Sequence, residues 1–187
     1  MLMALDLARQ MGLSVADRGR VPVCGEVSLL PSGDLVRGNE GRAYCRLRET
    51  VCDLIAVHSP REVWIEEAIA TSKRSIDTLR FLMGLQAVAE EAAASRGVPV
   101  FTAAVQTIRL QVLGNGGASK DDVLWWARDN DWRVVGDNGG DATALLAYAA
   151  CCDTPPWRLT PGPNAKAARD DVFARASAEA RGQARPA

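Results

Sequence analysis

Hydrophobic positions recur along the chain with two regular spacings. Short apolar or alternating runs predict five strands, which cover residues 3–8, 12–16, 23–30, 63–66 and 98–102. Apolar residues three and four positions apart predict helices, which cover residues 42–58, 75–96, 120–129 and about 140–151. For residues 107–113 we predict no element. Three strands followed by alternating helices and strands predict a mixed sheet covered by helices.

Turn-forming and capping residues place some of the boundaries. Gly97 ends the second predicted helix, and Ser119 is the expected N-cap of the helix that starts at Lys120, because serine accepts a hydrogen bond from the first turn. From about Thr154 the sequence becomes rich in Pro, Ala and Arg. We therefore predict one domain at 1–153 and a tail at 154–187, with a weak helix over about 165–181.

Composition limits the class of protein. At 187 residues and a net charge of −1, the chain is long enough for one ordinary domain. It has no apolar run of roughly 20 residues, the length that a membrane span needs, so we expect a cytoplasmic protein without a membrane partner. Five cysteines without a CxxC pair, and a single histidine, exclude an ordinary zinc site. We expect free, buried thiols, and we expect Trp125, Trp126 and Trp132 in the core.

Acidic residues in apolar surroundings are the main sign of chemistry. Asp6 and Glu66 stand in predicted buried strands, and Asp137 and Asp141 precede or begin the last predicted helix. A carboxylate inside an apolar strand is costly unless a basic group or a metal compensates its charge. Asp6 could pair with Arg9, and the last two could simply be favourable charges at a helix N-terminus. Taken together, these residues predict a carboxylate cluster for Mg²⁺ or Mn²⁺, which prefer oxygen ligands.

Four segments in this order resemble the RuvC-type Holliday-junction resolvases of the RNase H-like superfamily. They are Ala4-Leu5-Asp6-Leu7-Ala8 followed by Gly12, then Trp64-Ile65-Glu66, then Gly114-Asn115-Gly116-Gly117-Ala118-Ser119-Lys120-Asp121-Asp122-Val123, and Asp-Asn-x-x-Asp-Ala at 137–142. Their order and rough spacing match over residues 1 to about 152. The last segment is closer to phage-type members, because Asn138 stands where the family often has Asp or His.

The resemblance implies a fold and an active site. The fold would be α/β and RNase H-like (ribonuclease H), with a five-stranded mixed sheet flanked by helices. Asp6, Glu66 and Asp141 would ligate two Mg²⁺ ions, with Mn²⁺ as a substitute, and Lys120 would act beside the scissile phosphate. We expect Asp137 rather than Asn138 to be the fourth ligand. Because successive strand residues face opposite sides, only one of Glu66 and Glu67 can enter the site.

Further residues are candidates for binding DNA. They are Lys73, Arg74, Arg80, Arg109, Asn115 and Lys120. The apolar face of the helix that begins near Ser75 is wider than one sheet contact requires, which indicates a homodimer. A two-fold dimer suits a four-way junction, because two symmetry-related strands must both be cut.

These observations favour a Mg-dependent endodeoxyribonuclease that cuts branched DNA at crossover junctions, in DNA recombination and repair. One alternative is an RNase H-like nuclease of other specificity, for flaps, replication forks or packaging-associated DNA. Another is a non-catalytic DNA-binding module on the same scaffold, since Asn138 departs from the family pattern.

Overall fold

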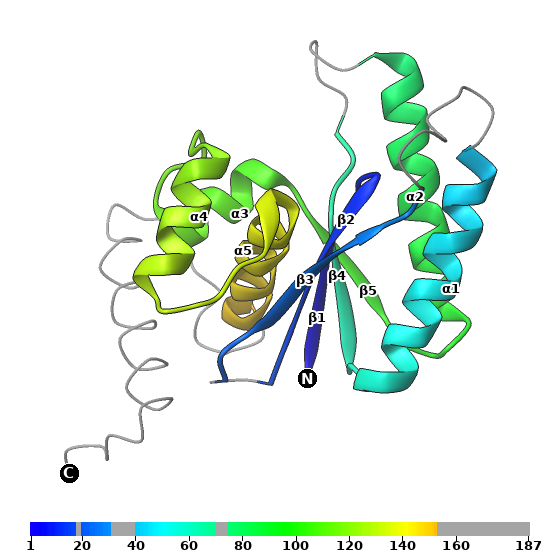
Figure 1. The fold of residues 1–187 in the computed structure, drawn as a ribbon, viewed down its shortest axis with the longest axis horizontal. Coiled ribbons are helices and arrows are strands. Elements are labelled where there is room, and N and C mark those ends of the chain that lie inside the picture. The colour runs from blue at the N-terminus through cyan, green and yellow to red at the C-terminus, as the bar shows by residue number, and fades with distance from the viewer. Residues whose placement is uncertain (18–19, 31–39, 70–74, 153–187) are drawn as a thin grey trace.

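The computed structural model describes residues 1–17, 20–30, 40–69 and 75–152. Its centre is a five-stranded mixed sheet in the order β3-β2-β1-β4-β5, with helices on both faces (Figure 1). The predicted α/β architecture is therefore confirmed. The tail at 154–187 lies outside the described residues.

The five predicted strands are all present, with bounds that differ by a few residues. They are β1 (Leu2–Asp6), β2 (Gln10–Ala16), β3 (Val23–Ser28), β4 (Glu62–Glu66) and β5 (Val100–Ala103). β1 pairs antiparallel with β2, and β2 antiparallel with β3. β4 runs parallel to both β1 and β5. β1 and β4 therefore end at the same edge of the sheet.

The helices differ from the prediction in two places. They are α1 (Glu40–His58), α2 (Ile76–Ala94), α3 (Val105–Leu113), α4 (Lys120–Asp129) and α5 (Gly136–Cys152). α3 occupies the stretch for which no element was predicted. α5 begins at Gly136 instead of near Gly140, so Asp137 and Asn138 lie in its first turn. The other boundaries agree closely, including Ser119 as the N-cap of α4.

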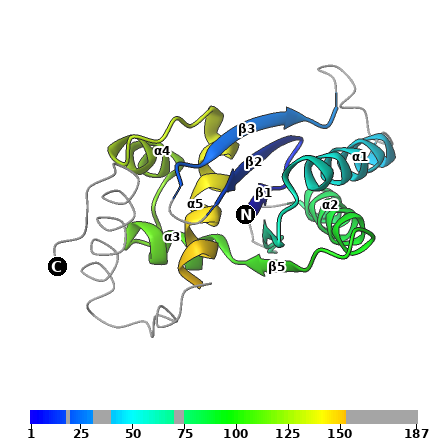
Figure 2. The same ribbon diagram turned by 90° about the horizontal axis from the view of Figure 1, so that it is seen from below.

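The alternation along β1 separates two hydrophobic cores. Met3 and Leu5 face α1 and α2, whereas Leu2 and Ala4 face α5 together with α3 and α4. Figure 2 shows α1 and α2 on one side of the sheet and α5 on the other. Because side chains alternate along a strand, Asp6 continues the row of Leu2 and Ala4 and faces α5.

The first turns of α5 lie directly against the backbone of β2 and β3. A Cβ atom at Gly12 would overlap the backbone carbonyl of Asn138. One at Gly139 would lie 3.5 Å from the carbonyl oxygen of Gly25. The hydroxyl of Thr143 donates to the hydroxyl of Ser14 at 3.2 Å, which adds a polar contact in the same interface. Glycine at position 12 is what allows this close approach.

Two sequence expectations about the core need correction. Trp126 is buried and meets the partly buried Trp132 edge to face, with ring centroids 5.2 Å apart. Trp125, however, is exposed. All five cysteines are free thiols, but Cys45 is exposed, and Cys52 and Cys151 are the two in the buried class. In the part of the chain that the structure describes, no helix has the length and apolar character to cross a membrane.

The contact at Gly12 predicts a specific loss of stability. Gly12→Ala should lower the free energy of unfolding by about 1–3 kcal/mol, because the added methyl group forces α5 away from β2. Gly25→Ala is the matched control, since a Cβ there meets nothing within 4 Å. Chemical denaturation of both variants measures the difference. Equal stability of the two variants would contradict the close packing of α5.

Candidate active site

Asp6 and Glu66 lie at the carboxyl ends of two adjacent parallel strands. The register pairs Leu5 with Ile65, so the next residue on each strand brings the two acids side by side. Trp64 packs in the core on the α5 side, and Glu66, two residues on, faces the same way. Glu67 is exposed, and its backbone N–H donates to the carbonyl of Ala103 at 2.9 Å. Glu66 is therefore the acid that shares a face with Asp6.

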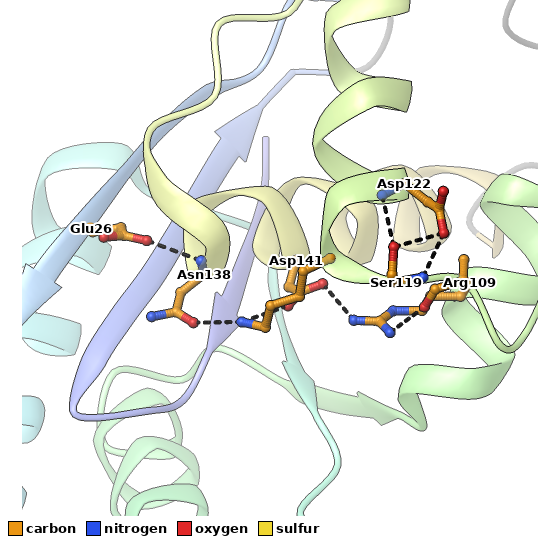
Figure 3. Close-up of polar contacts among 8 residues, drawn as sticks. Glu26, Arg109, Ser119, Asp122, Asn138 and Asp141 are labelled. Carbon is orange, nitrogen blue, oxygen red and sulfur yellow. Dashed lines mark hydrogen bonds and ion pairs between the residues drawn. The ribbon is translucent and has the colours of Figure 1, made fainter.

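Asp141 is buried on α5 between two basic side chains. Its side chain is 7% exposed, with Oδ1 3.0 Å from Nη2 of Arg109 and Oδ2 3.1 Å from Nζ of Lys120 (Figure 3). Arg109, on α3, also donates through Nη1 to the carbonyl of Ala118. A buried carboxylate is tolerated when it is paired and hydrogen-bonded. Arg109 and Lys120 therefore compensate the charge of Asp141.

The capping box of α4 positions Lys120. Ser119 Oγ accepts from the backbone N–H of Asp122 at 3.2 Å, and Asp122 Oδ2 accepts from the N–H of Ser119 at 2.7 Å (Figure 3). Lys120 is the first residue of this helix, so the cap fixes its backbone. Burial lowers the pKa of Lys120, but the charge and hydrogen bond of Asp141, with Asp6 and Asp137, outweigh burial and raise it. The side chain therefore remains a cation.

The electrostatics of Asp6 show that the acids belong to one cluster. Burial, followed by repulsion from Glu66 and Asp141, raises the pKa of Asp6 to about 8, against the lowering effect of Lys120 and Arg109. Arg9, the alternative partner for Asp6, instead places its guanidinium 5.8 Å from the ring centroid of Phe81. The crowding of like charges is what a divalent cation would relieve.

Asn138 contacts the cluster more closely than Asp137 does. Its Oδ1 accepts from Lys120 Nζ at 3.0 Å, and its Nδ2 donates to the backbone carbonyl of Gln10 at 2.6 Å. Asp137 is exposed and acts on Lys120 through its charge. The amide oxygen of Asn138 and Oδ2 of Asp141 thus reach the same ammonium group. This geometry favours Asn138 over Asp137 as a neighbour of Asp141.

Two contributions to the site were not foreseen from the sequence. Glu26, on β3, accepts the backbone N–H groups of Asn138 and Gly139 at 3.0 and 3.3 Å, and so caps α5. Arg109, a predicted DNA-binding residue, is 17% exposed and pairs with Asp141, a contact that the sequence did not indicate. Glu26 and Asn138 are 112 residues apart, and no local sequence pattern signals a contact at that distance.

The other candidates for DNA binding have local contacts or lie outside the described residues. Arg80, on α2, is exposed and lies 4.0 Å from Glu40. Asn115 is exposed after α3, and its Oδ1 accepts from the N–H of Gly117 at 2.9 Å. Lys73 and Arg74 lie outside the described residues. Among the predicted site residues, the structure brings together Asp6, Glu66, Asp141, Lys120 and Arg109.

The donor chemistry of the cluster fits a hard divalent cation. Asp6, Glu66 and Asp141 offer carboxylate oxygens, and Asn138 adds an amide oxygen, which are the ligands that Mg²⁺ and Mn²⁺ prefer. Among the described residues, no group of three or more His, Cys, Asp or Glu side chains is arranged to hold a metal as it stands. Asp141 is directed at its two basic partners. A metal would therefore have to replace at least one of these ion pairs.

Comparison with known proteins gives both sequence and structural relatives. No protein-family model matches the sequence. The crossover junction endodeoxyribonuclease RuvC of Bacteroides fragilis is 30% identical over 151 residues, which cover 75% of this chain and 77% of that protein.

Solved structures of such proteins have the same fold. Thermus thermophilus RuvC matches with a TM-score of 0.64 at 20% identity, over 81% of this chain and 94% of that chain. T. thermophilus RuvC in complex with a Holliday junction substrate matches with a TM-score of 0.65 at 17% identity, over 81% and 93%. The yeast mitochondrial Holliday junction resolvase Ydc2 matches with a TM-score of 0.56 at 12% identity, over 93% and 83%. The predicted RNase H-like fold is confirmed by these matches.

The raised pKa of Asp6 predicts how the metal-free protein responds to pH. The folded state holds a proton on Asp6 up to about pH 8, whereas an unfolded aspartate loses it near 3.8, so stability falls as the pH rises between these values. Asp6→Asn removes this penalty. In chelator, its melting temperature should match that of the unsubstituted protein near pH 4. At pH 8 it should be higher by more than about 2–4 °C, the effect of about 1 kcal/mol, because each unit of pKa difference alone contributes about 1.4 kcal/mol. A difference that does not grow with pH would contradict the crowded carboxylates.

Proposed function

The chain belongs to the RuvC family of crossover junction endodeoxyribonucleases, and we propose that it is a metal-dependent endonuclease that resolves four-way DNA junctions in the cytoplasm. The observation that carries this proposal is the meeting of Asp6, Glu66 and Asp141 with Lys120. These residues come from β1, β4, α5 and α4, so folding assembles the cluster at one edge of the sheet. Such a cluster is the usual basis of metal-assisted phosphodiester hydrolysis.

The chain supplies the binding and positioning groups for this reaction. Asp6, Glu66 and Asp141 would hold the divalent metal, which we propose is two Mg²⁺ ions with Mn²⁺ as a substitute. The metal would supply activation of the attacking water and neutralisation of charge on the phosphate. Lys120, which is 45% exposed beside Asp141, would contact a phosphate oxygen of the DNA. Arg109 would hold the Asp141 carboxylate in orientation from its buried side.

We propose Asn138 in place of Asp137 as the fourth oxygen ligand. Lys120 Nζ lies within hydrogen-bond distance of two oxygens, Oδ1 of Asn138 and Oδ2 of Asp141. One cation can therefore reach both oxygens. Asp137 would not contact the metal and would influence Lys120 through its charge. A neutral amide in this shell would make the metal affinity weaker than that of a site with four carboxylates.

We also propose that the protein acts as a homodimer through the face of α2. Ile76 is 85% exposed and Met83 is 56% exposed on this helix, which supports an apolar contact with a second copy. The nuclease domain would be 1–153 and the tail 154–187, as the sequence predicts. In such a dimer, Arg80 on α2 would lie within reach of the DNA. Asn115 would contact the DNA near α4.

Cleavage of synthetic DNA tests the proposed function. With Mg²⁺, the protein should introduce paired symmetric nicks in a four-way junction, and chelator should abolish them. Asp6→Asn should lower the rate by more than about 100-fold while junction binding persists, because loss of a ligand exceeds the usual effect of an outer-shell change. Asp53→Asn, an exposed aspartate of α1, is the matched control and should cleave normally.

Other outcomes of this assay identify the alternatives. Cutting of flaps or forks in preference to the junction would replace the proposed specificity with that of another RNase H-like nuclease. Junction binding without any metal-dependent cleavage, unchanged by Asp6→Asn, would show a non-catalytic DNA-binding module.

The choice of fourth ligand has a separate test. Asn138→Ala should raise the Mg²⁺ concentration needed for half-maximal cleavage by about tenfold, whereas Asp137→Ala should change it less than about twofold. Asn138→Asp should lower that concentration, because a carboxylate binds the cation more tightly than an amide. A larger effect from Asp137→Ala than from Asn138→Ala would restore Asp137 as the ligand.

A further inference from the structure

We infer that Glu26 is a positioning residue of the cleavage site, which acts by fixing the first turn of α5; this inference rests on the proposed function. Glu26 lies on β3, an edge strand of the sheet, and is not one of the carboxylates of the cluster. Its Oε1 accepts the backbone N–H of Asn138 (Figure 3). It also accepts the backbone N–H of Gly139. The serines that cap α2 and α4 directly precede those helices. The cap of α5, in contrast, comes from β3, 112 residues away in the sequence.

The residues around Glu26 leave space for this carboxylate. A Cβ at Gly136 would overlap the carboxylate of Glu26, and Gly136 has a φ of 67°, a conformation that favours glycine. A Cβ at Gly139 would lie 3.8 Å from Cγ of Glu26. Glycines at the start of α5 therefore permit Glu26 to reach the backbone. A carboxylate at the N-terminus of a helix is also electrostatically favourable.

The turn that Glu26 holds carries the site residues. Asn138 donates its own backbone N–H to Glu26, and its side chain joins Lys120 to the backbone of Gln10. Asp141 follows three residues later on the same helix, so the first turn sets the position of its carboxylate relative to Asp6. Glu26 and Asn138 attach this turn to β3 and β2 respectively. Loss of Glu26 would remove the attachment of this turn to β3 and leave the hydrogen bond of Asn138 to Gln10 on β2.

Metal affinity and local hydrogen exchange together test the inference. In Mn²⁺ titrations of the full chain by calorimetry, Glu26→Ala should raise the dissociation constant by about tenfold, the usual effect of losing an outer-shell support. Glu26→Gln keeps an acceptor oxygen and should recover most of the affinity. The N–H groups of Asn138 and Gly139 should exchange faster in Glu26→Ala than in the unsubstituted protein, with Glu26→Gln in between. The Mn²⁺ concentration needed for half-maximal cleavage by Glu26→Ala should rise in parallel with the dissociation constant.

Glu91→Ala is the matched control, because Glu91 forms an exposed pair with Arg48 on the other side of the sheet. Unchanged affinity and unchanged exchange in Glu26→Ala, or equal changes in Glu91→Ala, would overturn the inference. If Glu26→Ala does not fold, the test uses Glu26→Gln alone. A Mn²⁺ affinity of Glu26→Gln no better than that of Asp141→Asn would overturn the inference. Failure of the proposed function is distinguishable, since the unsubstituted protein would then not cleave the junction. The exchange measurement still decides whether Glu26 holds α5.

Discussion

The docking of α5 onto the backbone of β2 and β3 is the constraint on which the site depends. Gly12 has no side chain, so α5 packs closer to the sheet there than a Cβ atom would allow. Asp141 consequently reaches the carboxyl ends of β1 and β4, where Asp6 and Glu66 lie. A helix packed on ordinary side chains would hold its carboxylate further out. The glycine is therefore as much a part of the site as the acids are.

Burial of charge is the second constraint, and the chain meets it in two ways. The charge of buried Asp141 is compensated, because Arg109 and Lys120 each contact one of its oxygens. Asp6 is crowded by Glu66 and Asp141, and without a metal it keeps its proton to a higher pH than an exposed aspartate does. The charges of Asp141 and Asp6 are linked, since Arg109 and Lys120 also lower the pKa of Asp6. The cluster is thus one electrostatic unit and not a set of independent acids.

Much of the fold followed from hydrophobic spacing, because most elements have one clearly buried face. α3 was missed since it is short and mixes buried Ile108 and Val112 with exposed Leu110, which obscures the helical pattern. Trp125 was misplaced because residue type alone does not tell which side of α4 faces the core. A cluster that includes Asp6, Glu66 and Asp141 was expected from acids in apolar surroundings, and the role of Lys120 beside it from the family resemblance. Glu26 and Arg109 reach their partners through tertiary packing, which leaves no trace in local spacing.

The pairing of Asp141 with two cations has a consequence for handling the protein. In small zinc domains the metal is needed for folding, and chelators denature them. Here the most buried acid of the cluster already has its counter-charges within the chain. The domain can therefore fold, be purified and be stored in chelator with α5 in place. Under the proposed function, adding and withdrawing the cation would start and stop cleavage while the fold stays intact.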